Sequence, residues 1–383
     1  MTFDLRPSRL APFLCALVVS GLAQAQSWPM HQGNASHTGH APVTVVTDAI
    51  RTAWSKQLTD GGVGLTGVAV ANGRLFVSST GYFSGQFLYA LNAATGKRLW
   101  KVDYGSVFSV NPPSYADGLV YVQTGNHGVD TWLRGLDAKT GEQRFQSPHA
   151  AQWERYLAPT VYKNQVYVHA GYYGGMQAFR KDSGVSQWFL GLPQYDQWTP
   201  AVDERHAYSF VGGTMHVVDR PTGQLAFTME DPGFDWTGWS AHQAPVLGGQ
   251  GDVYVTSGGR LVKFDVERRR MVWKKDDASY LGQAAIANGV VYASSNVGVI
   301  ARAQAGGERL WTWWVPSTES VASNLVITNT HLFVSTNVAT HCVDLTTHQT
   351  VWTTSAVGQL AVADGHLYIA GATGLLTAVK LTP

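Results

Sequence analysis

Five titratable side chains lie in aromatic-rich stretches of the chain and are the candidates for catalytic chemistry: Glu154, Asp196, Asp235, His242 and Glu319. A carboxylate paired with an imidazole or a second carboxylate could supply a general acid and a general base. Their spacing, however, matches no phosphate loop, nucleophile elbow or helical zinc motif. Such residues in loops more often are solvated or hydrogen-bond a turn. The sequence therefore leaves enzymatic activity open and favours a role without catalysis.

Three histidines near the expected mature N-terminus raise the question of a metal site. His31, His37 and His40 are close in sequence, but their spacing matches no established ligand set. We expect a mobile, solvated segment here and no bound metal.

The second group of candidate site residues is aromatic. The chain has 14 Trp, 16 Tyr and 14 Phe, and Trp and Tyr offer flat apolar area with a polar edge, which suits stacking on ligands and protein interfaces. Some of the tryptophans could instead wedge between neighbouring repeats. The candidates for binding a ligand or partner are Tyr82, Phe83, Trp132, Trp153, Arg155, Tyr156, Tyr172, Tyr195, Trp198, Phe234, Trp236, Trp239, Trp313 and Trp314.

A repeat determines which elements position these residues. Hydrophobic–aromatic–small triplets, such as Leu75-Phe76-Val77, recur after polar turns and predict strands that enter from hairpins. A second series places an aromatic residue eight positions after each of seven residues: Asn92, Asp137, Arg180, Asp219, Asp265, Ala303 and Asp344. The two series predict repeated units of four strands, and the period of about 43 residues is that of a propeller blade.

The last unit ends before an outer strand, whereas residues 51–58 form an outer strand without a unit of its own. We therefore predict an all-β fold: one eight-bladed β-propeller of four-stranded blades, with the ring closed by the N-terminal strand around Trp54. The expected organisation is a signal peptide over residues 1–25, an N-terminal extension over 26–50 and the propeller over 51–383.

Loop lengths differ between the units and indicate a functional face. The interval between the aromatic residues of the second and outer strands is 24, 24 and 21 residues in the first three units and 19 in the next four. The additional residues fall between the second and third strands, and a further insertion lies at 231–242. In an up-and-down blade these loops emerge on the same side as the segments that link the blades. Insertions confined to one face are typical of a binding surface.

The first 25 residues resemble a secretory leader, because Arg6 and Arg9 precede an apolar run that ends in Ala23-Gln24-Ala25. The run is too short to span a membrane, and Cys15 lies within it rather than at a lipidation site. We expect a periplasmic or secreted protein without a lipid anchor. Cys342 would then be the one remaining thiol, and its place in the repeat predicts a small buried side chain. The formal net charge of +1 offers no basic field for nucleic acid.

Two motifs carry a family resemblance: Trp28-Pro29-Met30-His31-Gln32-Gly33-Asn34, and units such as residues 90–100. They resemble the repeats of the pyrroloquinoline-quinone-type propeller family, which includes quinoprotein dehydrogenases and the outer-membrane β-barrel assembly subunit BamB. In size and blade count the chain is closer to BamB. The resemblance implies an exported, monomeric binding scaffold whose aromatic face engages a protein partner or an extended ligand.

The alternative is an exported enzyme or a binding protein for a sugar, an aromatic compound or a quinone, using the same face. No cofactor is expected. Pyrroloquinoline quinone remains the alternative, and the lack of the Cys-Cys pair that often accompanies it in the dehydrogenases counts against it.

Overall fold

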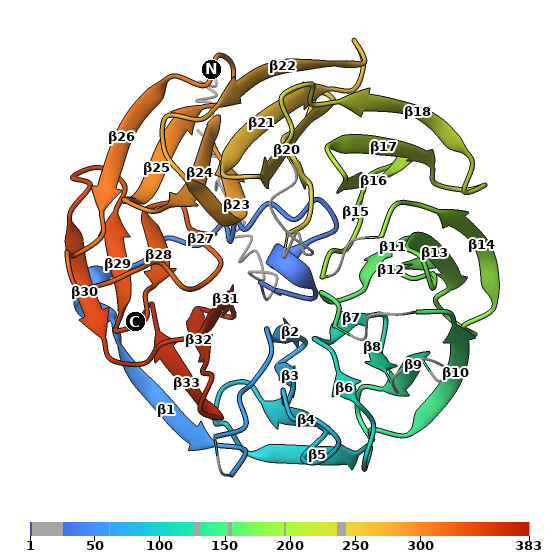
Figure 1. The fold of residues 1–383 in the computed structure, drawn as a ribbon. Helices are drawn as coiled ribbons and strands as arrows, with labels where there is room; N and C mark the ends of the chain where they lie inside the picture. The colour runs from blue at the N-terminus through green and yellow to red at the C-terminus, as the bar shows by residue number, and fades with distance from the viewer. Residues whose placement is uncertain are drawn as a thin grey trace.

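The protein is a ring of eight antiparallel sheets (Figure 1), as given by a computed structural model. The structure describes Met1 and residues 26–60, 62–125, 131–151, 155–194, 197–235 and 243–382. These residues form an all-β, eight-bladed propeller, which confirms the predicted fold class. Among them are two short 3₁₀ helices, η1 (His31–Gly33) and η2 (Thr47–Ala49), and no helix has the length and apolar character needed to cross a membrane.

Each blade runs from an inner strand at the channel to an outer strand at the rim. Blade one comprises β2 (Ala69–Ala71), β3 (Arg74–Ser78), β4 (Phe87–Asn92) and β5 (Arg98–Asp103); in blade two, β6 (Ser109–Val110) and β7 (Ser114–Ala116) share the inner position beside β8 (Leu119–Gly125), β9 (Thr131–Asp137) and β10 (Gln143–His149). Blade three comprises β11 (Thr160–Tyr162), β12 (Gln165–His169), β13 (Gly175–Arg180) and β14 (Ser186–Gly191), and blade four β15 (Ala201–Val202), β16 (His206–Val211), β17 (Thr214–Asp219) and β18 (Leu225–Glu230).

The second half of the ring repeats this order. Blade five comprises β19 (Val246–Leu247), β20 (Asp252–Ser257), β21 (Arg260–Asp265) and β22 (Arg270–Lys275), and blade six β23 (Tyr280–Ala287), β24 (Val290–Ser295), β25 (Gly298–Ala303) and β26 (Arg309–Trp314). Blade seven comprises β27 (Val326–Ile327), β28 (His331–Ser335), β29 (Thr340–Asp344) and β30 (Thr350–Thr354), and blade eight β31 (Gln359–Ala363), β32 (His366–Ala370), β33 (Leu375–Lys380) and β1 (Arg51–Gln57).

The ring closes as the sequence predicts. β1 pairs antiparallel with β33, with Arg51 opposite Lys380 and Gln57 opposite Leu375. In Figure 1 this blue N-terminal strand lies along the outside of the red C-terminal blade. The closing sheet therefore joins the two ends of the propeller and leaves the last blade with a complete set of four strands.

A β-bulge directs the repeated outer-strand aromatic residue of each blade. The register of the third and outer strands shifts by one residue just before this aromatic residue, as at Trp100, and the shift recurs in all eight blades. A bulge bends the strand and re-aims the next side chain. The residue opposite the ring is often small: Ala90 faces Trp100, and Cys342 faces Trp352. Cys342 is fully buried, which confirms its prediction as a small core side chain.

At five of the eight junctions the re-aimed aromatic residue packs on a turn glycine of the next blade. A Cβ atom on Gly96 would lie 2.7 Å from Trp54, and one on Gly141 would lie 2.9 Å from Trp100. The Trp54 and Trp100 indole N–H groups donate to backbone carbonyls of the following blade at 3.1 Å. The positive φ of these glycines also fits a tight turn. The tryptophan and glycine of the repeat therefore form the contact between blades.

The N-terminal segment lies in the middle of the ring (Figure 1) and is hydrogen-bonded to every blade. Backbone hydrogen bonds join residues 26–39 to Asp364, Val70, Tyr115, Val202, Leu247, Ile286 and Ile327, and His37 reaches blade three through the Thr160 hydroxyl. We call residues 28–41 the plug. The expectation of a mobile, solvated segment was wrong, because backbone hydrogen bonds to six blades hold the plug and His37 is buried.

The tryptophan–glycine contact predicts a difference between two otherwise similar substitutions. Gly73 and Gly141 both have positive φ, but nothing lies within 4 Å of a Cβ placed on Gly73. Gly73→Ala should cost about 1 kcal/mol for backbone strain. Gly141→Ala should cost about 1–3 kcal/mol more, because its methyl group meets the Trp100 ring. Urea unfolding of both variants measures the difference, and equal losses would show that the contact adds nothing to the stability of the ring.

Candidate functional site

A blind cavity opens at the centre of one face of the ring. We call it the funnel, and we call the face on which it opens, formed by the blade-linking segments and the loops between second and third strands, the funnel face. The cavity has a volume of about 450 Å³ and is lined by residues from blades one, two, three, four, six, seven and eight and from the segments that precede them. Its size is that of a site for a small ligand or a peptide end.

The plug forms the floor of the funnel. Trp28, Met30, His31 and Gln32 all line the cavity. The Gln32 side chain donates to the Ala284 and Leu325 carbonyls at 3.4 and 3.3 Å, and Asn324 donates to Gln32 at 2.8 Å. The floor is thus hydrogen-bonded to two blades, and the funnel ends at the plug instead of continuing through the ring.

An aromatic cluster stands beside the mouth of the funnel. Tyr82 and Phe83 are 50% and 53% exposed, and both rings meet the Phe108 ring edge-on at 5.3 and 5.2 Å. The Arg155 guanidinium lies 4.3 Å from the centre of the Tyr82 ring. We call Tyr82, Phe83, Phe108 and Arg155 the lip. Because Gly81 and Arg155 also line the cavity, the lip and the funnel are continuous.

The electrostatics of the funnel are dominated by one cation. Among the described residues that line the funnel, Arg155 is the one with a permanent charge. Burial lowers the pKa of His31 to about 4, against the effect of its hydrogen bond with Gln283, so His31 is neutral near pH 7. The described part of the lining is therefore neutral apart from one positive charge at its edge.

Most of the funnel's amide side chains connect blades. Gln283 of blade six accepts from the Ala244 N–H at 2.8 Å and donates to its carbonyl at 3.0 Å. Asn324 makes the same pair of bonds with Leu360, both at 2.9 Å. Asn111 accepts from the Tyr156 N–H at 2.8 Å. These amides stabilise the ring and have little capacity left for a ligand.

Four aromatic and imidazole rings pack beneath the funnel wall at blades two and three. His169 stacks on Trp198 at 4.6 Å and meets Tyr156 edge-on at 5.4 Å, and His149 lies 6.1 Å from Tyr156. Burial lowers the pKa of His149 to about 4 and that of His169 to about 3. Burial also lowers the pKa of His37 in the plug. The wall and floor therefore contain histidines that stay neutral while the protein is folded.

The predicted aromatic site residues divide by burial. Tyr82, Phe83, Tyr172 and Trp314 are exposed, Trp132 and Phe234 are partly buried, and Tyr156 is a buried funnel residue. Trp198 and Trp313 are only 1% and 5% exposed and pack in the core, which is the alternative that the sequence left open. Their role in binding stays a prediction. Seven predicted site residues lie outside the described residues: Trp153, Glu154, Tyr195, Asp196, Trp236, Trp239 and His242.

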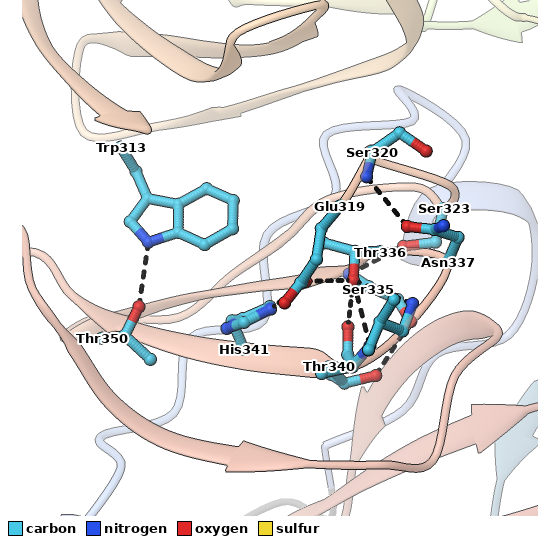
Figure 2. A network of polar contacts seen from close by, with 12 residues as sticks. Trp313, Glu319, Ser320, Ser323, Ser335, Thr336, Asn337, Thr340, His341 and Thr350 are labelled. Atoms are coloured by element: carbon cyan, nitrogen blue, oxygen red, sulfur yellow. Dashed lines mark hydrogen bonds and ion pairs between the residues drawn. The ribbon is translucent and has the colours of Figure 1, made fainter. Parts of the chain in front are cut away.

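Glu319 belongs to a network of hydrogen bonds between blades six and seven (Figure 2). Its carboxylate accepts from the Thr336 hydroxyl at 2.6 Å and from His341 Nε2 at 2.8 Å. The bond from Thr336 lowers the pKa of Glu319, opposed by burial and supported by His341. Glu319 is not among the residues that line the funnel. The geometry gives it a role in fixing the segment between two blades.

The base of the 231–242 insertion is attached to blade five. Asp231 pairs with Arg260 at 2.8 Å, and its carboxylate accepts from the Gly233 N–H at 3.1 Å. Phe234 packs partly buried against the Gly213 turn, whereas Asp235, the other described catalytic candidate, is exposed. Asp235 and Glu319 come from different blades and lie outside the funnel lining. In the described residues, no acid–base pair forms from these candidates.

Several funnel residues had no clear signal in the sequence. Trp28 and Met30 belong to the quoted N-terminal motif, but only the fold places them in the channel. The wall residues Pro112 and Pro113 interrupt the inner strand of blade two. Their adjacency marks a break in a strand, but it does not indicate a cavity.

Matches to a family model define the class of this propeller. The model described as outer membrane protein assembly factor BamB matches residues 43–188, 135–313 and 197–382, which together span most of the chain. The chain belongs to this family. No curated protein sequence matches it.

Solved structures share the fold at low identity. BamB from Moraxella catarrhalis is 20% identical with a TM-score of 0.65, covering 86% of this chain and 97% of that chain. A europium-containing methanol dehydrogenase is 14% identical with a TM-score of 0.70, covering 93% and 98%. The quinohemoprotein alcohol dehydrogenase from Comamonas testosteroni is 15% identical with a TM-score of 0.68, covering 94% and 82%. At these identities the likeness shows the fold alone.

The funnel can be tested against the quinone of the structurally similar dehydrogenases. Pyrroloquinoline quinone is an aromatic tricarboxylate, whereas the described funnel lining offers one permanent cation, Arg155. Across the described ranges, no three His, Cys, Asp or Glu side chains come close enough to hold a metal ion, and Cys342 is buried in blade seven. The described residues therefore do not fit this cofactor.

The buried histidines predict acid sensitivity. His31, His37, His149 and His169 have lowered pKa values in the folded state, whereas the unfolded chain binds protons below about pH 6.5. Their contribution is complete above about pH 6.5 and is lost as the pH falls toward the folded pKa values. The free energy of unfolding should fall by about 1 kcal/mol per histidine between about pH 6 and 5.

Urea unfolding followed by tryptophan fluorescence at several pH values measures this dependence. His149→Gln should flatten it by about 1 kcal/mol per pH unit, because one titration is removed. The carboxylates with depressed pKa values titrate at lower pH and do not contribute in this window. A free energy of unfolding that stays constant from about pH 7 to 5 would contradict the prediction.

The Glu319 network predicts a second, more acidic effect. The lowered pKa of Glu319 means that its contribution is present above its ordinary pKa and is lost as the pH falls through the folded value. Glu319→Gln should cost about 1–3 kcal/mol near pH 7, because a neutral amide oxygen accepts the two hydrogen bonds more weakly than the ionised carboxylate does. Glu142→Gln, at an exposed hairpin tip, is the matched control and should cost less than about 0.5 kcal/mol.

Proposed function

We propose that this protein is an exported binding scaffold that engages a protein partner on the funnel face. The observation that carries the proposal is the lip: Tyr82 and Phe83 are half exposed beside a blind cavity, although neighbouring rings hold them in place. Rigid, exposed aromatic side chains beside a pocket are typical of interface hot spots. The family's description as an assembly factor supports a role in protein interaction.

Other exposed aromatic residues extend the same face. Tyr172 and Tyr173 lie in the loop between the second and third strands of blade three and pack edge-on at 5.0 Å. Trp314, at the end of β26, is also exposed. The opposite face, which we call the turn face, consists of short hairpin turns fixed by polar caps, such as Asp137 accepting from the Thr140 N–H at 3.0 Å. The contrast between the faces favours the funnel face as the interface.

We further propose that the protein is monomeric and unlipidated, and that it is periplasmic or secreted after removal of residues 1–25. The support for this is the sequence of the leader and the attachment of Gln26 to blade eight through the Asp364 N–H at 3.0 Å. A small-molecule site is the second candidate function, and the observation that favours it is the volume of the funnel.

Site-specific photocrosslinking in the producing cells tests the proposal. A photoreactive phenylalanine analogue at Tyr82 or Tyr173 should give a discrete crosslinked protein, whereas the same analogue at Lys97, in an exposed turn on the turn face, should not. Phe83→Ser should reduce the Tyr82 crosslink about tenfold without lowering the melting temperature, because exposed substitutions rarely affect stability. Equal crosslinks on both faces, or none on the funnel face, would refute the assignment of the interface.

A further inference from the structure

The Arg155 guanidinium has no anionic partner among the described residues. It lines the funnel, and within the described residues its recorded interaction is with the face of the Tyr82 ring. Other arginines that line or border the core do have partners: Arg260 pairs with Asp231 at 2.8 Å, and Arg302 pairs with Asp277. An arginine whose guanidinium packs on an aromatic ring can still donate its N–H groups to a carboxylate.

A second polar group in the funnel also lacks a partner. The Ser294 side chain lines the cavity, is 2% exposed, and its hydroxyl makes no hydrogen bond within the described structure. A buried hydroxyl without a partner costs free energy. A ligand oxygen or N–H group in the funnel would satisfy it. The amides Asn111, Gln283 and Asn324 are occupied by the backbone, so Ser294 and Arg155 are the free polar groups that most clearly point to a ligand.

The remaining wall is largely apolar. Pro112, Pro113, Leu157, Val321 and Leu360 line the sides, and Trp28 and Met30 lie at the floor. An apolar cavity of this size favours a hydrophobic body, and a second charge on the ligand would be buried without a partner. The lining therefore selects a ligand with one negative charge and an otherwise apolar form.

We propose that the funnel binds the C-terminal residue of a partner polypeptide, with its carboxylate on Arg155 and an apolar last side chain on the proline and leucine wall. The inference rests on the proposed function, because it names what the partner inserts on the funnel face. A polypeptide end suits the site better than a free acid, because the exposed rings of Tyr82 and Phe83 extend the site outward from the funnel beside Arg155. A polypeptide end supplies one carboxylate and a chain that continues outward.

Calorimetric titration with a matched pair of peptides tests the inference on the full mature protein. The probes are acetyl-Gly-Ser-Gly-Phe with a free carboxylate and the same peptide as a C-terminal amide, with 3-phenylpropanoate as the free acid. The free-carboxylate peptide should bind at least about tenfold more tightly than the amide and than 3-phenylpropanoate. Arg155→Gln should remove that preference, and Ser294→Ala should weaken binding a few-fold.

Two variants control for structural effects. Arg98→Gln removes an exposed arginine from the outer strand of blade one and should leave peptide affinity unchanged. Ala322→Trp places a large ring at an exposed position of the funnel lining and should abolish binding while the melting temperature stays within a few degrees.

The outcomes separate this inference from the proposed function. Equal binding of the acid and amide peptides, or retention of the preference in Arg155→Gln, would overturn carboxylate recognition while leaving a peptide-binding face. Tighter binding of 3-phenylpropanoate than of the peptide would overturn the polypeptide source in favour of a small acid. If none of the probes binds at millimolar concentration, the inference is wrong, and the crosslinks from Tyr82 and Tyr173 alone then decide the proposed function.

Discussion

The packing of an outer-strand aromatic residue on a turn of the next blade is the interaction on which the ring depends. Within the described residues the blades form separate sheets. At five of the eight junctions the aromatic ring packs on a turn glycine, and at two others Phe227 meets Arg269 and Trp311 stacks on His348. These contacts therefore set the angle between neighbouring blades. At four tryptophans the indole N–H also donates to a carbonyl of the following blade, at 3.0–3.4 Å. Trp54 makes this contact from the N-terminal strand, so the first and last segments of the chain close the ring by the same means.

Closing a ring of eight blades leaves a central channel, and the plug fills its lower part. The inner strands end with free backbone groups that face the channel, and residues 26–39 provide their hydrogen-bond partners one blade after another. Burial of such groups without partners would destabilise the fold. The plug therefore completes the inner strands, and the funnel is the part of the channel above it. The funnel is therefore a direct consequence of how the ring provides hydrogen-bond partners for the backbone groups of its inner strands.

Much of this fold could be predicted from the sequence, because each unit of a repeat can be compared with the other units. The eight-residue interval from Asn92 to Trp100, and its six counterparts, indicated the hairpin, and the missing outer strand predicted the closure by Trp54. The bulge before each aromatic residue had no signal, since it changes the register without changing the spacing. The plug was mispredicted for a related reason. His31 and His37 make contacts more than 200 residues away in the chain, and local polarity cannot reveal such partners.

The site was predictable in its side chains but not in their arrangement. Arg155 and Tyr82 were both named from the aromatic insertions, yet their contact joins a loop of blade one to the segment before blade three. Trp198 and Trp313 have the same composition as the lip residues, but the fold buries them. The exposure of an aromatic side chain depends on whether a neighbouring blade covers it. The order of residues along the chain does not contain that information.

Proteins of this fold differ in function because the funnel face is free to vary. The turn face holds the capped hairpins and the glycines that receive the aromatic residues, so changes there would alter the angle between blades. The funnel face holds loops of unequal length. They are attached to the ring by the amides of Asn111, Gln283 and Asn324, by the Glu319 network and by the Asp231–Arg260 pair. Among the described lining residues Arg155 is the one permanent cation, and three carboxylates on one ligand would then share one guanidinium in a largely buried site, which is electrostatically unfavourable.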